Sequence, residues 1–294
     1  VAHCGATPWI LDIDAYWSLD PALLAEALQR HCEVDTSGSC RHLATGARVA
    51  AVMPVHTLGA PADCTALAAL ARGFGIPVVA DAAAALGARD TGRRIGELGV
   101  DLSVVSFNGN KTVTAGGGGC VVGDDETLLQ LARHLTTTAK VGADYTHDRV
   151  GYNYRMTNLQ AAVGCAQMER LDEFVAAKRR IHARYTAAWG DLPAVAAFPT
   201  RDGVESACWL SGLVLPTDRS AAEVTASLRD RGVEARTFWQ PLHRQAPYQH
   251  APSLLRGVAD AVWSRIVTLP CSTQLTDEQQ HLVIAAVKAV LGVP

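Results

Sequence analysis

Two short apolar runs, each ending in a polar residue, dominate the hydrophobic pattern of the chain. The run 78–80 leads into Asp81, and the run 104–107 leads into a polar loop that carries Lys111. Short continuous apolar runs are typical of strands that are buried on both faces of a parallel sheet. The carboxyl ends of such strands border the crevice where α/β proteins bind ligands. We therefore expect Asp81 and Lys111 to share one cleft.

A helical pattern lies between two strand candidates in the first third of the chain. Apolar residues in 63–74 recur at i, i+3, i+4 and i+7, which is the spacing of one helix face. The apolar run 49–53 predicts a buried strand before this helix, and 77–81 predicts the next strand after it. Strand, helix and strand with short links form a βαβ unit, which implies a parallel sheet and a right-handed crossover.

The pattern in the second half of the chain predicts a smaller domain joined by a long helix. Helical spacing continues from Asn158 to about Trp189, which is long enough to connect two domains. We also predict helices at 20–30, 125–136, 221–231 and 277–291, strands near residue 10 and at 209–215 and 233–237, and loops at 31–46, 139–154 and 238–248. The expected fold class is α/β, with a mostly parallel sheet and flanking helices in residues 1–156, a linking helix in 157–190 and a small α+β domain in 191–294.

The composition limits the possible partners. The 294 residues carry a formal net charge of −3 without a block of Lys or Arg, so we expect no nucleic-acid interface. The apolar run 282–287 is too short to span a bilayer, and no signal peptide opens the sequence, so we expect no membrane partner. The eight cysteines form no CxxC pairs, which favours small core residues in a reducing cytoplasm over metal ligands.

A carboxylate, a lysine and a hydroxyl around one crevice are what pyridoxal phosphate requires. This cofactor needs a lysine amine for its Schiff base and an acidic partner for its pyridinium nitrogen. A desolvated site lowers the pKa of the lysine, so that the amine can become neutral and attack. The four glycines from Gly116 to Gly119 let the backbone approach closely beside Lys111.

Three segments resemble the DegT/DnrJ/EryC1/StrS family of pyridoxal phosphate-dependent sugar aminotransferases in their order and spacing. They are VADAAAALGA (79–88), SFNGNKTVTAGGGG (106–119) and VGYNYRMTNLQAAVGCAQMERLDEF (150–174). The resemblance implies a type I PLP-dependent transferase fold, pyridoxal 5'-phosphate as cofactor and a homodimer with shared active sites. It also implies amination of a nucleotide-linked 4-keto-6-deoxy sugar to the 4-amino sugar, with glutamate as donor. The second segment carries Asn108 where many members have histidine, and in this it resembles the members that act on UDP-linked sugars.

The resemblance also implies roles for four residues of the cofactor site. Lys111 matches the Schiff-base lysine, and Asp81 matches the partner of the pyridinium nitrogen. Ser106 matches a hydroxyl that binds the cofactor phosphate, and Asn153 matches an asparagine that reaches the phosphate from the neighbouring subunit. Each has a simpler interpretation: most lysines are solvated, Asp81 is placed to cap a short helix, and Asn153 is typical of a turn before a helix.

Two further residues match the region where the small domain of the family covers the substrate. Arg236 and His243 lie in EARTFWQPLH, although a loop histidine is more often only a surface residue. Ala84 is a departure, because many members carry Gln or Glu there, near the phenolic oxygen of the cofactor. The resemblance begins inside the cofactor domain, so we expect that the chain lacks an N-terminal part with a Gly-Thr pair for the phosphate.

Two alternatives to the aminotransferase remain open at this point. A sugar dehydratase of the same family has histidine in place of the Schiff-base lysine, so Lys111 argues against it. A truncated, catalytically impaired member that acts as a binding or regulatory protein is favoured by Ala84 and by the expected missing segment.

Overall fold

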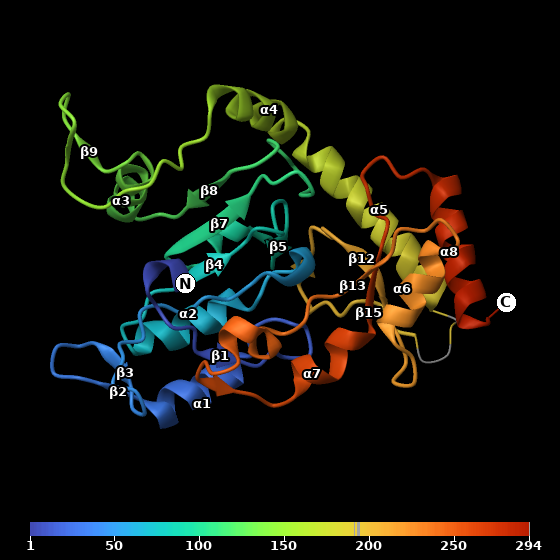
Figure 1. Ribbon diagram of the computed structural model, residues 1–294, viewed down its shortest axis with the longest axis horizontal. Helices are drawn as coiled ribbons and strands as arrows, with labels where there is room; N and C mark the ends of the chain where they lie inside the picture. The colour runs from blue at the N-terminus through green and yellow to red at the C-terminus, as the bar shows by residue number, and fades with distance from the viewer. Residues whose placement is uncertain (191, 193–194, 294) are drawn as a thin grey trace. The chain divides into compact units, whose positions relative to one another are not determined.

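The computed structural model describes residues 1–190, 192 and 195–293 (Figure 1). The chain forms two compact units, which we name by their place in the sequence. The terminal unit comprises Val1–Cys32, Val175–Asp202 and Cys208–Pro294, and the central unit comprises Glu33–Phe174 and Gly203–Ala207. The first 32 residues group with the C-terminal part of the chain, and the predicted domain limits at 156 and 190 stay a prediction.

The central unit is built on a three-stranded sheet that contains both predicted site strands (Figure 1). Its strands, in spatial order, are β4 (Val79–Asp81), β7 (Leu102–Ser106) and β8 (Gly119–Val122). Strands β4 and β7 are parallel, whereas β8 runs antiparallel to β7. The parallel pairing of the two strands that precede Asp81 and Lys111 agrees with the sequence-based prediction.

The predicted buried strand at 49–53 is reduced to single bridges. Val52 pairs with Val78 and Val55 pairs with Asp81, both in parallel orientation. Only Val52 of the predicted strand is buried, and the side chain of Met53 is about half exposed. The prediction of a buried strand was therefore wrong here, since the apolar run is covered on one side only.

Helix α2 (Cys64–Gly73) lies where the sequence predicts the helix of the βαβ unit. The side chain of Asp63 accepts a hydrogen bond from the amide of Ala66 at 3.0 Å and caps the first turn. The helix buries four of its residues, Cys64, Leu67, Ala68 and Ala71. This face has the helical spacing seen in the sequence.

Smaller elements fill the rest of the central unit. They are the strands β5 (Arg89–Asp90), β6 (Arg93–Arg94) and β11 (Val204–Glu205), which form one sheet, the hairpins β2 (Cys32–Val34) with β3 (Cys40–His42) and β9 (Lys140–Val141) with β10 (Thr146–His147), and the 3-10 turns η2 (Thr57–Gly59) and η3 (Ile95–Glu97). The two hairpins lie in the predicted loops 31–46 and 139–154. These segments contain too few apolar residues for the sequence pattern to predict strands.

The predicted long helix consists of two consecutive helices, α4 (Asn158–Met168) and α5 (Leu171–Trp189). Helix α3 (Glu126–Thr136) precedes both of them in the chain. The amide of Arg170 donates to the carbonyl of Gln167, only three residues back, and this tighter turn closes α4. Phe174 then donates to the carbonyl of Arg170 as the next helix begins.

The first residues of the chain are tied to its C-terminal part within the terminal unit. Strand β1 (Ile10–Leu11) pairs in parallel with β14 (Ser253–Leu254). The buried carboxylate of Asp12 accepts hydrogen bonds from the amides of Ile13, Arg256, Val258 and Ala259 at 2.7–3.0 Å. These bonds explain why residues 1–32 do not group with the central sheet.

A second three-stranded sheet forms the centre of the terminal unit. Its strands, in spatial order, are β12 (Ser211–Val214), β15 (Ile266–Leu269) and β13 (Arg236–Thr237), all antiparallel. The other elements are the helices α1 (Pro21–His31), α6 (Ala221–Arg229), α7 (Val258–Val262) and α8 (Asp277–Leu291), and the 3-10 turns η1 (Ala2–Cys4), η4 (Leu242–Arg244), η5 (Ala246–Tyr248) and η6 (Trp263–Arg265). The central strand β15 was not predicted from the sequence.

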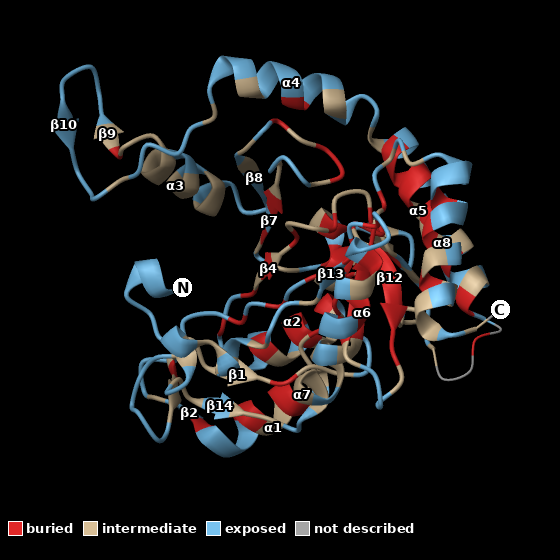
Figure 2. Cartoon of the chain, turned by 45° about the vertical axis from the view of Figure 1, so that its right-hand side comes forward, coloured by how far each residue is buried: buried red, intermediate tan, exposed pale blue. Residues whose placement is uncertain are grey.

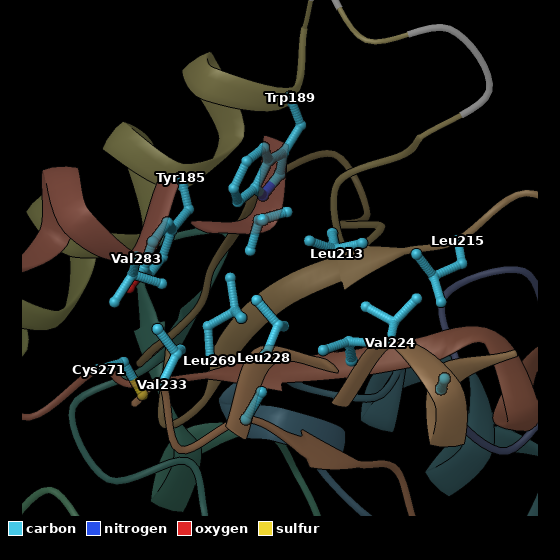
Figure 3. Packing of buried hydrophobic residues seen from close by; sticks show 14 of the residues in the cluster. Tyr185, Trp189, Leu213, Leu215, Val224, Leu228, Val233, Leu269, Cys271 and Val283 are labelled. Atoms are coloured by element: carbon cyan, nitrogen blue, oxygen red, sulfur yellow. The ribbon is translucent and has the colours of Figure 1, made fainter. Parts of the chain in front are cut away.

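Helix α5 packs on this sheet through large side chains (Figure 3). Tyr185 and Trp189 of α5 are almost fully buried with Leu213 of β12 and Leu269 of β15. Buried polar atoms in this core have partners, since the Trp189 indole donates to the carbonyl of Gly212 at 3.1 Å and the Tyr185 hydroxyl to that of Pro270 at 2.8 Å. The predicted α+β character of this part of the chain is therefore confirmed.

The cysteines divide into two groups. Five of them are buried, at positions 32, 40, 64, 208 and 271, as the sequence predicts for small core residues. Cys4, Cys120 and Cys165 are exposed instead, and for these three the prediction was wrong.

Candidate active site

The register of the central sheet places Asp81 and Ser106 on one face. Asp81 of β4 pairs with Val104 of β7, and paired residues of neighbouring strands point to the same side. Ser106 lies two residues beyond Val104 and therefore shares that side. Both residues end their strands and both are half-buried. A carboxylate and a hydroxyl thus meet at the carboxyl edge of two parallel strands, where α/β proteins bind ligands.

Lys111 follows β7 in a tight turn, with its amide donating to the carbonyl of Asn108 at 3.0 Å. Burial lowers the pKa of the Lys111 ammonium, because a charged group loses hydration there, while the nearby charge of Asp81 acts in the opposite direction. The structure therefore brings the lysine within electrostatic reach of Asp81. The depressed pKa increases the fraction of neutral amine, which is the form needed for nucleophilic attack.

Two hydroxyls near the lysine differ in their bonding. The Ser106 hydroxyl accepts a hydrogen bond from the amide of Asn108 at 3.2 Å. Thr112, next to Lys111, is buried, and its hydroxyl has no hydrogen-bond partner among the described residues. A buried hydroxyl without a partner is unusual, so the environment of Lys111 retains polar capacity that a bound group can use.

The glycine run after this loop is required by close backbone contacts. A Cβ at Gly119 would lie 2.2 Å from the carbonyl oxygen of Val105, a distance that no side chain tolerates. Gly116 and Gly118 adopt φ values of 77° and 79°, in the left-handed region that favours glycine. The glycines therefore let β8 turn back directly beside β7 and hold the Lys111 loop in place.

These residues fit pyridoxal phosphate. A lysine with a lowered pKa, a carboxylate in electrostatic reach of it and a serine on the same sheet face are the donor set that this cofactor uses. Ala84, after Asp81, is half-buried and offers no side-chain hydrogen bond to a phenolic oxygen.

Asn153 is held in another part of the central unit. It forms an antiparallel bridge with Thr137, just after α3, and its neighbours Tyr152 and Tyr154 donate to the carbonyls of Leu135 and Thr136. Its role toward a neighbouring subunit stays a prediction.

His56 is a buried residue near the site that sequence reasoning missed. Its amide donates to the carbonyl of Asp81 at 3.0 Å, and its Nδ1 accepts from the amide of Ala62 at 3.1 Å. Burial lowers the pKa of His56 to about 4, although Asp81 and Asp90 act to raise it. The ring is therefore neutral with its proton on Nε2. The signal in the sequence was a histidine three residues after the strand candidate 49–53.

Arg236 and His243 both belong to the terminal unit. Arg236 is exposed on β13 and forms an ion pair with Glu234, which is exposed as well. His243 contacts the carboxylate of Asp260 at 3.0 Å, and Arg244 donates to the same oxygen at 2.5 Å. The hydrogen bond from Arg244 lowers the pKa of Asp260 below its ordinary value. Burial acts to raise this pKa, and the hydrogen bond with His243 lowers it further. His243 thus helps to anchor its loop to α7.

A polar recess of about 520 Å³ lies near the start of α6 and is bordered by Arg219 and Arg265. Arg265 donates two of its N–H groups to the carbonyls of Leu215 and Ala261. Among the described residues there is no group of three or more His, Cys, Asp or Glu side chains placed to hold a metal ion. Within the same residues, no helix has the length and apolar character needed to cross a membrane.

Solved structures with the same architecture include aminotransferases. TlmJ of Streptoalloteichus hindustanus superposes with a TM-score of 0.86 and 28% identity, covering 99% of this chain and 75% of that chain. DesV of S. venezuelae gives a TM-score of 0.80 and 28% identity, covering 95% and 71%. The fold and the residues around Lys111 therefore define a pyridoxal phosphate-dependent aminotransferase.

Sequence comparison gives the family. The GDP-perosamine synthase of Caulobacter vibrioides is 34% identical over 99% of this chain and 75% of its own length. The family model of the DegT/DnrJ/EryC1/StrS aminotransferases matches residues 1–288. The chain belongs to the DegT/DnrJ/EryC1/StrS aminotransferase family. The predicted family, type I fold, enzyme class and cofactor are confirmed.

Proposed function

We propose that this enzyme transfers an amino group from glutamate to the 4-keto group of a nucleotide-linked 4-keto-6-deoxy sugar. The observation that carries the proposal is the pairing of Lys111, whose pKa is lowered by burial, with Asp81 at the ends of parallel strands. Similarity to GDP-perosamine synthases from two organisms, at 34% and 31% identity, supports a sugar nucleotide as the amino acceptor.

Each site residue has one task in this proposal. Pyridoxal phosphate, when bound, supplies the electron sink for the carbanion at the reacting carbon. Lys111 would hold the cofactor through Nζ, and its neutral amine would move the proton of the donor Cα as general base and general acid. Asp81 would favour the protonated form of the ring nitrogen. Ser106 would bind the cofactor phosphate through its hydroxyl.

The cofactor assignment is tested by absorption spectroscopy of the purified chain with pyridoxal phosphate. We expect a visible band that borohydride removes while it fixes the cofactor to the peptide containing Lys111. Lys111→Ala loses both the band and the covalent label, whereas the control Lys140→Ala, at a half-buried lysine elsewhere in the central unit, keeps them. A band that persists in Lys111→Ala contradicts the assignment.

The substrates are tested separately from the cofactor. Glutamate alone should convert the visible band of the enzyme to the absorption of the amino form of the cofactor, and a 4-keto-6-deoxy sugar nucleotide should reverse the change. Aspartate and alanine serve as matched donors. Conversion by alanine but not by glutamate contradicts the proposed donor, and the absence of reversal contradicts the proposed acceptor.

We further propose a homodimer in which Asn153 of each chain reaches the cofactor phosphate of its partner. Support comes from exposed apolar residues that lie near Asn153 in the sequence, in the loop after α3 and in α4, two segments that are largely exposed (Figure 2). The most exposed are Tyr145, Val150, Tyr154 and Leu159. Exposed apolar residues gathered in one stretch of the chain favour an interface with another chain.

Mixing two inactive variants tests the shared site. Lys111→Ala and Asn153→Ala are each expected to be inactive, and their mixture should regain activity, since a mixed dimer contains one intact site. A mixture that forms dimers but stays inactive contradicts the role of Asn153. A mixture of Lys111→Ala with Asp81→Asn is the control that should not recover, because both changes damage the same chain's contribution.

A further inference from the structure

The loop that carries Lys111 contains two threonines whose hydroxyls are bonded differently. The hydroxyl of Thr114 donates to the carbonyl of Phe107 at 3.2 Å and accepts from the amide of Gly116 at 2.9 Å. Thr112 is only 8% exposed, and its hydroxyl has no hydrogen-bond partner among the described residues. Thr114 therefore holds the loop together, whereas the hydroxyl of Thr112 contributes no such bond in the part of the chain that the structure describes.

The backbone on both sides of Thr112 is fixed. The amide of Lys111 donates to the carbonyl of Asn108 at 3.0 Å, and the amide of Ala115 donates to the carbonyl of Phe107 at 2.9 Å. Val113, between them, is buried as well. A buried hydroxyl without a partner costs free energy, and such groups are rare in native proteins unless they serve a bound molecule or a catalytic role.

The position of Thr112 limits which molecule this is. Thr112 is joined by a peptide bond to Lys111, and the side chain of Lys111 lies within electrostatic reach of Asp81. All three residues belong to the central unit. A group that is joined to Nζ of Lys111 and held by Asp81 is therefore bound beside the loop that carries the buried hydroxyl.

Pyridoxal phosphate offers three polar groups to the protein, which are its ring nitrogen, its phosphate and its phenolic oxygen. The proposed function assigns the nitrogen to Asp81 and the phosphate to Ser106. The phenolic oxygen is attached to the carbon next to the one that bears the link to Lys111, and the side chain of Ala84 has no polar atom to offer it. A threonine hydroxyl is a suitable donor to such an oxygen.

We propose that the hydroxyl of Thr112 donates a hydrogen bond to the phenolic oxygen of pyridoxal phosphate and thereby sets the acidity of the link between the cofactor and Lys111. This inference rests on the roles proposed above for Lys111, Asp81 and Ser106. In the linked cofactor, the phenolic oxygen and Nζ of Lys111 share one proton. A second donor to the oxygen weakens its hold on that proton, so Thr112 lowers the pKa of the link.

Spectrophotometric pH titration of the loaded enzyme tests this role, because the visible band of the cofactor changes when the shared proton leaves. Thr112→Val keeps the shape of the side chain and removes the hydroxyl. We expect it to raise the pKa of the visible band by about 1 and to weaken binding of pyridoxal phosphate about tenfold. Thr112→Ser should restore both values. Thr127→Val, at an exposed threonine of the same unit, is the control and should change neither.

Pyridoxal, which lacks the phosphate, separates the two acceptors of the cofactor. If Thr112→Val weakens binding of pyridoxal phosphate but not of pyridoxal, the hydroxyl serves the phosphate and the inference is overturned. An unchanged pKa and an unchanged affinity also overturn it.

Urea denaturation of the cofactor-free chain separates this role from a structural one. Thr112→Val should unfold at the same or a higher urea concentration than the wild type, since it removes no bond that the structure shows. A lower concentration would assign the hydroxyl to the fold and overturn the inference. Absence of a visible band in the wild type would instead overturn the role proposed for Lys111, and this inference with it.

Discussion

The sheet of the terminal unit and the sheet of the central unit bury their strands differently. Strands β12 and β15 are buried at every residue, with helix α5 contributing Tyr185 and Trp189 to the same core (Figure 3). In the central sheet, β7 alternates between buried and accessible residues, and Val104 is 41% exposed. The accessible side of β7 is the side that carries Ser106 and, across the register, Asp81.

The difference shows a division of labour between the two units. A sheet that is buried on both faces gains the most from the hydrophobic effect and sets the stability of its unit. A sheet with one accessible face can offer polar residues at its strand ends to a ligand, at the cost of some packing. Substitutions in the terminal core should therefore change stability, and substitutions on the accessible face of the central sheet should change catalysis.

The largest expected effect is on stability, from Leu213→Ala in β12. Leu213 is fully buried, and truncation of a buried leucine removes apolar contacts and leaves a cavity. We expect a loss of about 3–5 kcal/mol in the free energy of unfolding, measured by urea denaturation. The matched change Val104→Ala in β7 should cost less than about 1 kcal/mol. Equal losses at the two positions would remove the contrast between the sheets.

A catalytic effect of similar size is expected at Asp81. Asp81→Asn keeps a side-chain oxygen to accept from the amide of Ala83, as Asp81 does at 3.0 Å, so the fold should be unaffected. The amide cannot hold the ring nitrogen of the cofactor in its protonated form, and turnover should fall about 10²- to 10³-fold. Single-turnover rates with glutamate measure this loss. Asp124→Asn, at an exposed aspartate, is the control, and a near-normal rate in Asp81→Asn would exclude the residue from the site.

Acid should destabilise the central unit through His56. Burial lowers the pKa of His56 to about 4, below the value near 6.5 of an unfolded histidine. The neutral ring therefore contributes its full stability above about pH 6.5, and this contribution is lost as the pH falls toward 4. The full loss is about 3 kcal/mol, measured by urea denaturation across this range. His56→Gln should flatten the pH dependence, whereas a change of the exposed His250 to Gln should preserve it. Unchanged pH dependence in His56→Gln would show that other groups control the acid response.

The smallest of these effects is expected at Asp12 in the terminal unit. Asp12→Ala leaves the amides of Arg256, Val258 and Ala259 without their acceptor, which should cost about 2 kcal/mol. Hydrogen exchange should increase at these three amides and in β1, and the central sheet should stay protected. Asp218→Ala, at an exposed aspartate of the same unit, is the control. Exchange that increases equally in both units would contradict the separate stability of the terminal unit.

Local signals in the sequence were sufficient for most helices and for the two strand ends of the candidate site. The helices predicted at 20–30, 63–74 and 125–136 are present, and Asp20, Asp63 and Asp125 each accept hydrogen bonds from amides in the first turn of the helix that follows. The apolar runs that end at Asp81 and precede Lys111 likewise marked neighbouring parallel strands. These features depend on residues only a few positions apart.

Features that depend on distant residues were decided only by the tertiary structure. Strand β15 became the centre of a sheet because β12 and β13 flank it, although its four residues carry no periodic signal. The carboxylate of Asp12 accepts a hydrogen bond from an amide 244 residues later. The ring of Trp239 stacks on that of Trp209, which directly follows Cys208, a residue with a φ of 50°. The sequence by itself determined most helices, the two strand ends of the candidate site and the family, because these follow from local patterns. The tertiary structure decided which faces are open and which rings meet, since those depend on packing between segments that the sequence keeps far apart.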